Sequence, residues 1–224
     1  KGFVPFIAIS GFIGALILFQ PATTILIIVM VSALIVYFAS GLKMSHLFLI
    51  ALLGILAFVF VIYATPYRYE RIKNFFIEDE ANDATSRYQI NRAQEAIGSG
   101  GLFGVGFGKS TTKFKYLPEP IGDSIFAVVA EELGFAGSLF LISVFILFFI
   151  RGILIAKKAS DQFGKLAVMG LVSAIAIQTF IHIGAVSGLI PLTGVPLPFI
   201  SYGGTALAVF LTMSGIIVNI SKHS

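Results

Sequence analysis

The stretch "IFAVVAEELGFAGSLFLISVFILFFI", residues 125–150, sets the fold class of this sequence. A transmembrane helix needs about 20 predominantly apolar residues, and this stretch is long enough to supply them. No part of the sequence alternates apolar and polar residues over the length of a membrane β-strand, so helices are the expected spanning elements. The sequence therefore predicts an all-α integral membrane protein.

The composition agrees with a membrane location. Hydrophobic residues make up 57% of the 224 residues and charged residues only 12%, whereas soluble domains carry about 25% charged residues. There is no Cys, which excludes disulfide bonds, thiolate metal ligands and thiol nucleophiles within these residues. The sequence begins at Lys1 without an initiator Met or a signal-peptide pattern, and we expect it to be a piece of a longer polypeptide.

Six apolar segments reach or approach the length of a membrane span. They are residues 3–19, 22–40, 46–65, 125–150, 166–188 and 204–220. We therefore expect residues 1–224 to form a single membrane domain, a polytopic helical bundle of about six transmembrane helices. A long extracytoplasmic loop, about residues 66–124, is expected between the third helix and the fourth.

The basic residues predict the orientation of the spans. Six spans place both chain ends on one side of the membrane, where the short loops contain a single acid, Asp161. The basic residues of that side are Lys1, Lys43, Arg151, Lys157, Lys158, Lys165 and Lys222. The positive-inside rule makes this side, with both chain ends, cytoplasmic. Residues 66–124 and 189–203 are then extracytoplasmic, and long loops cross the membrane regardless of their own charge.

The long outer loop has predicted structure of its own. Ser86 followed by Gln89 is a capping-box pattern, which predicts a short helix over about 87–97 that ends near Gly98. Apolar residues fall at helical spacing along it, at positions 90, 93 and 97. One side of this helix is therefore expected to lie against the bundle or the bilayer surface.

The decamer "GLFGVGFGKS", residues 101–110, has glycines like those of a phosphate-binding loop, but the pattern fails. A P-loop needs Gly where this sequence has Phe103, and the loop is predicted to face outward, so we expect no nucleotide cofactor. Glycines that alternate with apolar residues suit a backbone packed against helices or lying at membrane depth. The lysines that follow, Lys109, Lys113 and Lys115, are either interfacial lysines near anionic headgroups or a pyrophosphate clamp.

Three acids lie at the start of the fourth span. Asp123 directly precedes the apolar run, where it is either a helix N-cap or a carboxylate that faces a cavity and acts as a base. Glu131 and Glu132 lie about two turns further along, where an unpaired carboxylate is costly. We expect these two to pair with basic residues.

Two further features lie near the second outer loop. Gln178 and His182 share one helix face, and a polar pair in a membrane helix usually joins helices, with a proton relay as the alternative. Residues 188–205, "GLIPLTGVPLPFISYGGT", are rich in Pro and Gly, and such irregular backbone is tolerated where it is buried or lines a water-filled cavity. We expect it to converge with the other irregular outer segment, 99–124, on one outward-facing cavity.

Three long motifs occur in order and carry a family resemblance. They are "YQINRAQEAIGSGGLFGVGFGKS", "KYLPEPIGDSIFAVVAEELGFAG" and "GLIPLTGVPLPFISYGG". With the spans between them, they resemble the SEDS proteins (FtsW, RodA and SpoVE) over essentially the whole chain, as the family's C-terminal half. The stretch "KSTTKFKYLPE" is more similar to the division and sporulation branch than to the elongation branch.

The resemblance implies a peptidoglycan glycosyltransferase that polymerises lipid II at the outer face of the bacterial cytoplasmic membrane, during cell division or sporulation. The family's essential aspartate falls on Asp123, which the resemblance makes the general base, the ligand of a divalent cation such as Mg²⁺ or Mn²⁺, or both. Substrate-binding roles are expected for Arg87, Lys109, Lys113, Glu119, Ser201 and Tyr202. The alternatives are a lipid-linked precursor transporter (a flippase) and an inactive division scaffold.

The implied partners are lipid II and its undecaprenyl-pyrophosphate-linked glycan, a class B penicillin-binding protein, other divisome proteins and membrane lipid, with no nucleic acid. The sequence departs from the family pattern near the aspartate, where Ile121-Gly122 replaces His-Thr and Ser124 replaces Phe. Ala22 stands where the family has an acid, and Thr205 where it has Ser. These residues on their own are expected to be inactive, because part of the family's substrate groove is missing.

Overall fold

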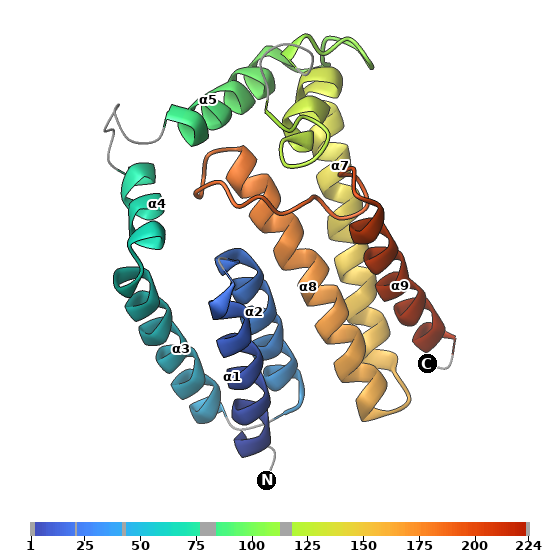
Figure 1. Cartoon of the computed structure of the whole chain (residues 1–224). Helices are drawn as coiled ribbons and strands as arrows, with labels where there is room; N and C mark the ends of the chain where they lie inside the picture. Colours follow the sequence, from blue (N-terminus) through green and yellow to red (C-terminus); the bar gives the residue numbers. More distant parts are fainter. Residues whose placement is uncertain (1–2, 21, 42–43, 77–83, 113–117, 223–224) are drawn as a thin grey trace. The chain divides into compact units, whose positions relative to one another are not determined.

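The computed structural model describes residues 3–20, 22–41, 44–76, 84–112 and 118–222, and these residues are predominantly helical (Figure 1). The helices are α1 (Phe3–Phe19), α2 (Thr23–Ala39), α3 (Met44–Ala64), α4 (Pro66–Phe76), α5 (Ala84–Ser99), α7 (Ile125–Lys158), α8 (Gln162–Val186) and α9 (Gly204–Ser221). No strand occurs in this part of the chain. The predicted all-α architecture is confirmed.

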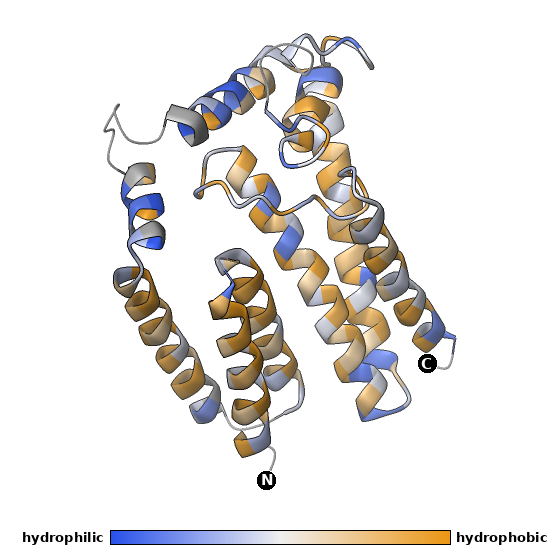
Figure 2. Cartoon of the chain, viewed as in Figure 1, coloured by the Kyte–Doolittle hydropathy of each residue, from blue (hydrophilic) through white to orange (hydrophobic). Residues whose placement is uncertain are grey.

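Three helices, α7, α8 and α9, are long and apolar enough to cross a membrane. Shorter apolar helices occur at Phe3–Phe19, Thr23–Ala39 and Phe48–Ala64, so every segment predicted to span is helical. Figure 2 shows the apolar character of α1, α2 and α3 against the hydrophilic stretches of α4 and α5. The polytopic membrane helices are thus as predicted, and the count of six crossings stays a prediction.

The chain divides into two compact units. Unit 1 comprises Lys1–Val61, Phe149–Ile177 and Thr212–Ser224, and unit 2 comprises Ile62–Phe148 and Gln178–Leu211. Inside unit 1, small residues allow helices to approach closely, as is typical of membrane helix interfaces. A Cβ on Gly152 of α7 would lie 2.4 Å from the Val172 side chain of α8, and a Cβ on Gly170 would lie 3.1 Å from Val36 of α2.

The core of unit 2 joins the amphipathic helix α5 to α7 and α8. Its buried residues are Ala93, Ala96, Phe126, Ala127, Val128 and Val186. Ile97 of α5 packs against this cluster, so the apolar side of α5 faces protein, one of the two surfaces predicted for it. Small alanines on α5 bring its backbone close to α7, which fixes the start of α7 relative to α5.

The long outer loop contains a second helix, and one prediction about the loop is wrong in detail. Residues Pro66–Phe76 form helix α4, and the side chain of Arg71 in this helix donates to the carbonyl oxygen of Leu192. Helix α5 already includes Ala84, so Ser86 lies inside it and is not its N-cap. The Gln89 side chain instead donates to the Ser124 hydroxyl at 3.1 Å, a partner 35 positions away that no local pattern predicts.

Helix α7 is interrupted at Gly134, whose φ of 67° and ψ of −166° are not helical. A break inside a membrane helix leaves backbone amides and carbonyls without intrahelical partners, at a cost of several kcal/mol each in lipid. The Gly-rich loop 100–106 supplies those partners. The hydrogen bonds are Phe135 N–H to Gly101 O (2.9 Å), Ala136 N–H to Leu102 O (3.0 Å), Val105 N–H to Glu131 O (3.0 Å) and Gly106 N–H to Glu132 O (3.1 Å).

Candidate active site

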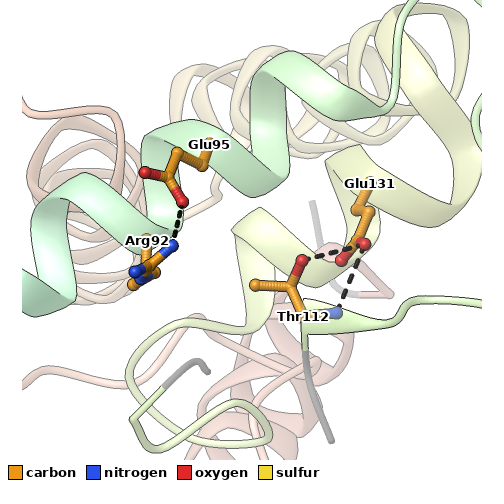
Figure 3. Close-up of polar contacts among 4 residues, drawn as sticks. All are labelled: Arg92, Glu95, Thr112 and Glu131. Atoms are coloured by element: carbon orange, nitrogen blue, oxygen red, sulfur yellow. Dashed lines mark hydrogen bonds and ion pairs between the residues drawn. The ribbon is translucent and has the colours of Figure 1, made fainter. Parts of the chain in front are cut away.

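The Gly-rich loop folds its amides around the carboxylates of Glu131 and Glu132. Glu131 is only 2% exposed and accepts hydrogen bonds from the backbone and hydroxyl groups of residues 110–112. Figure 3 shows the hydrogen bond that the Thr112 hydroxyl donates to the Glu131 carboxylate, and its length is 3.0 Å. Glu132 accepts from the amides of Gly108 (2.9 Å) and Ser110 (3.4 Å). The loop that resembles a phosphate cradle therefore holds two carboxylates of its own chain.

The glycines of this loop are needed for its approach to α7. A Cβ on Gly100 would lie 2.1 Å from the Ala130 carbonyl oxygen, and a Cβ on Gly104 equally close to that of Glu132. The described donors to Glu131 are the amides and hydroxyls of residues 110–112, and the expectation that Glu131 and Glu132 pair with basic residues stays a prediction. Neutral donors suffice, because a carboxylate that accepts several backbone hydrogen bonds is stabilised without a counter-charge.

Asp123 is in a different position from the one an N-cap takes. Helix α7 begins at Ile125, which makes Ser124 the residue that flanks its first turn. The buried Ser124 hydroxyl donates to the Pro118 carbonyl at 3.0 Å and accepts from Gln89. The N-cap interpretation of Asp123 is therefore wrong, and this aspartate lies on the turn that leads into the helix.

The two irregular segments meet at Ser201, as predicted. Its hydroxyl donates to the Gly122 carbonyl at 2.8 Å and accepts from the Leu197 amide at 2.7 Å. The Tyr202 amide adds a bond to the Ile121 carbonyl at 2.8 Å. Ser201 thus fixes the peptide next to Asp123 to the second loop, and the predicted cavity between the segments stays a prediction.

The Asp123 carboxylate is half-buried beside Gly194. A Cβ on Gly194 would lie 3.4 Å from Asp123 Oδ2, and Gly194 has a φ of +63°, so a side chain at this position would be strained and would crowd the carboxylate. Among the described residues, no hydrogen bond or ion pair engages the Asp123 side chain.

Helix α8 holds the second loop through the polar pair Gln178 and His182. Gln178 Nε2 donates to the Pro196 carbonyl at 2.9 Å, and His182 Nδ1 lies 2.8 Å from the Val195 carbonyl oxygen. The pair was predicted to join helices, and instead it anchors a loop. Because a carbonyl only accepts, Nδ1 carries the proton of this bond.

The sequence pattern pointed to His182 but not to its position near Asp123. It is 1% exposed, its Nε2 has no partner among the described residues, and it lies within electrostatic range of Asp123. Nothing in the sequence spacing links positions 123 and 182. The connection runs through residues 194–196, which contact both the aspartate and the helix that carries the histidine.

The other predicted site residues are distributed over three segments. Glu119 is exposed at the start of the Asp123 turn, with a φ of 45°, and its carbonyl accepts from the Gly122 and Ser124 amides. The Tyr202 side chain is exposed, Lys109 is exposed in the Gly-rich loop, and Arg87 is half-buried on α5. Lys113 and Lys115 lie outside the described residues. Glu119, Ser201 and Tyr202 are thus brought to the turn of Asp123.

Across the described residues, no group of three or more His, Asp or Glu side chains could hold a metal ion. Asp123 supplies a single carboxylate.

The family model for FtsW, RodA and SpoVE, described as "Cell cycle protein", matches residues 1–224. The chain belongs to the FtsW/RodA/SpoVE family. Stage V sporulation protein E from Bacillus subtilis is 40% identical over 224 residues, which are 100% of this chain and 61% of that protein. The probable peptidoglycan glycosyltransferase FtsW of the same organism is 42% identical over 230 residues, covering 98% of this chain and 57% of the relative.

A family member with a different name, MrdB, matches as well. Peptidoglycan glycosyltransferase MrdB from Escherichia coli K12 is 38% identical over 208 residues, or 91% of this chain and 56% of MrdB. The chain thus spans about three fifths of the length of the FtsW/RodA/SpoVE relatives that it matches.

Two solved structures share the fold. One chain, from "Structural coordination of polymerization and crosslinking by a peptidoglycan synthase complex", has a TM-score of 0.74 and 25% identity, with 97% of this chain and 59% of that chain covered. The other, an aspartate-to-alanine mutant of the Thermus thermophilus rod shape determining protein RodA, has a TM-score of 0.61 and 24% identity, with 98% and 57% covered. The all-helical architecture is therefore that of the FtsW/RodA/SpoVE family.

Proposed function

We propose that this protein, in its full length, is a peptidoglycan glycosyltransferase that polymerises lipid II. The observation that carries the proposal is Asp123. It is a half-buried carboxylate on a tightly held turn at the start of a membrane-length helix, and the described residues leave its oxygens unengaged. Relatives named peptidoglycan glycosyltransferase FtsW and MrdB support the reaction class.

In the proposed reaction, the 4-hydroxyl of an acceptor GlcNAc attacks C1 of the donor MurNAc. A new C–O bond forms, the bond from C1 to the pyrophosphate oxygen breaks, and undecaprenyl pyrophosphate leaves. A sugar hydroxyl is a weak nucleophile, so a base must take its proton as the new bond forms. Asp123 takes this role, because its lone pairs are not committed to the protein.

Glu131 and Glu132 are unsuited to the same role, although they lie within ten residues of Asp123. Their oxygens accept hydrogen bonds from the Gly-rich loop, and taking a proton would weaken these bonds. His182 is buried within electrostatic range of Asp123 and adds no second carboxylate.

The departing pyrophosphate requires positive charge. In the proposal, this positive charge comes either from Lys109, Arg87 and Lys113 or from a bound Mg²⁺ or Mn²⁺ ion. A magnesium ion is commonly held by one or two carboxylates together with substrate phosphates and water. Asp123 fits the carboxylate of such a site, and the substrate rather than the protein would complete it.

The proposed site faces the outer leaflet, with both chain ends cytoplasmic. Helix α7 begins two residues after Asp123 and carries Lys157 and Lys158 in its last turn. The positive-inside rule favours a cytoplasmic position for the basic end of this helix, and this supports an outer position for Asp123.

The proposed partners are lipid II, the surrounding membrane lipid, divisome proteins and a class B penicillin-binding protein. The transpeptidase is supported by the solved chain that belongs to a peptidoglycan synthase complex, described as coordinating polymerization and crosslinking. A polymerase beside a crosslinking enzyme would pass nascent glycan directly to it.

The test replaces Asp123 by Asn in the full-length protein, assayed with its partner on lipid II in vesicles. Loss of a general base is expected to lower the polymerisation rate by about 10²–10⁴-fold. The matched control is Asp161→Asn, the same chemical change in the loop between α7 and α8, where the Asp161 carboxylate accepts from the Gly164 amide of α8. Unchanged polymerisation in Asp123→Asn would overturn the assignment. Transport of lipid II across the vesicle bilayer, measured in the same samples, separates polymerase from flippase.

A further inference from the structure

The Gly-rich loop presents four exposed apolar side chains. Phe103 is 83% exposed, Phe107 is 86% exposed and Leu102 is 68% exposed, with Val105 between them. The backbone beneath them is satisfied by the broken helix α7, as the hydrogen bonds at Gly134 show. A loop with apolar side chains outward and its backbone polar groups paired inward meets the condition for lying in lipid.

The place where the loop contacts α7 coincides with the start of the helix's uncharged stretch. Residues 133–150 carry no charge between Glu132 and Arg151. The part of this stretch beyond the break, residues 135–150, rises about 24 Å as a helix, which approaches the thickness of a bilayer's hydrocarbon core. The hydrocarbon boundary on this side therefore falls near Gly134, which is the residue against which the loop packs.

The surface of α7 continues that of the loop. Phe135, Leu139 and Phe140 are all exposed on the helix just beyond the break, and they belong to a segment apolar enough to span the membrane. The amides of Phe135 and Ala136 bind the loop carbonyls, so the loop and this lipid-facing part of the helix are adjacent. Lys109, exposed at the end of the loop, suits an anionic headgroup.

We infer that residues 102–107 form a membrane anchor, a loop whose Leu102, Phe103, Val105 and Phe107 side chains insert into the leaflet at the N-terminal end of α7. The occupant of this surface is lipid, because the surface is continuous with that of a membrane helix and begins at its hydrocarbon boundary. The inference does not depend on glycosyl transfer. It assigns the loop a second task beside holding Glu131 and Glu132.

The test uses single Trp residues as probes of their surroundings, since these 224 residues contain no Trp. The variants Phe103→Trp and Phe107→Trp are made in the full-length protein and reconstituted in phosphatidylcholine–phosphatidylglycerol vesicles. Emission of the parent protein is subtracted. Phe140→Trp provides the lipid reference, and Tyr88→Trp, on the α5 face that carries Arg92, provides the water reference.

In vesicles with brominated acyl chains, both loop probes should lose most of their emission, as Phe140→Trp does, and aqueous iodide should have little effect on them. Tyr88→Trp should show the reverse. Loop probes quenched by iodide like Tyr88→Trp would overturn the inference. So would probes quenched by neither agent, because that result places the loop against protein, either a partner or a second copy. Both substitutions are aromatic and at exposed positions, and size-exclusion chromatography verifies that each variant remains folded.

Discussion

Two groups of carboxylates lie within ten residues at the start of α7, and the protein treats them in opposite ways. Glu131 and Glu132 are buried, and the Gly-rich loop surrounds them with amides and hydroxyls. Asp123 is half-buried on a turn fixed by Ser201, but no hydrogen bond from the described residues reaches its carboxylate. In the first region the carboxylates stabilise the loop, and in the second the backbone is held so that the carboxylate stays available.

The comparison teaches that burial alone does not identify a functional acid. A buried carboxylate is costly unless donors surround it. The loop supplies donors to Glu131 and Glu132, and the two carboxylates in turn hold the loop in place. An accessible carboxylate on a rigid turn has lone pairs to offer to a substrate. The distinction depends on hydrogen-bond partners, and it predicts different consequences for the same chemical change.

The largest expected effect comes from Glu131→Gln compared with Asp123→Asn. The first change turns an amide group toward the donors of residues 110–112 and leaves them unpaired, so the free energy of unfolding should fall by about 3–4 kcal/mol. The second should change it by less than about 0.5 kcal/mol, because no intramolecular bond is lost among the described residues. SDS titration in mixed micelles measures both. Equal destabilisation would erase the distinction between the two regions.

A second test concerns the glycines that let the loop reach α7. Gly104 and Gly108 have nearly the same φ, 79° and 78°, but only a Cβ at Gly104 meets backbone, 2.1 Å from the Glu132 carbonyl oxygen. Gly108→Ala should cost about 1 kcal/mol from its φ alone. Gly104→Ala should cost about 2–3 kcal/mol, since the loop must also move away from the helix. If the two variants unfold alike, the loop does not depend on this close approach.

The third test concerns the hydrogen bonds of Ser201 that hold the turn of Asp123. Ser201→Ala removes the bond to Gly122 and leaves the buried Leu197 amide unpaired, which should lower the free energy of unfolding by about 2 kcal/mol. Polymerisation at a temperature where the variant is folded should fall as well, because the turn of Asp123 loses its support. Ser99→Ala, which loses only a local bond to Ala96, is the control. Full activity in Ser201→Ala would show that polymerisation does not need the hydrogen bonds of Ser201.

The smallest effect is expected at an exposed carboxylate. Glu95 forms an ion pair with Arg92 on α5 at 2.5 Å (Figure 3), and both side chains are open to solvent. Exposed pairs contribute little to stability because water competes for both charges. Glu95→Gln should therefore leave the unfolding curve and the polymerisation rate unchanged within error. A clear loss of stability in Glu95→Gln would contradict the comparison, because an exposed carboxylate would then contribute to stability as the buried carboxylates do.

Much of the architecture was predictable from local patterns. Each predicted span is helical, α5 occupies the predicted region, and the two irregular segments meet as expected at Ser201 and Gly122. The misses share a cause. Ser86 and Asp123 both matched N-cap patterns, but the helix boundaries were decided elsewhere. Gln89, for example, is bound to Ser124, which comes from a distant part of the chain.

The sequence by itself determined the membrane helices, the family and the identity of the candidate acid. Runs of apolar residues and short motifs are local, and the cost of placing polar backbone in lipid leaves them few alternatives. Only the tertiary structure decided which carboxylates are satisfied and which is available. That outcome depends on donors from segments about 20 or more positions away, brought within 3 Å by glycines that have no side chain to prevent it.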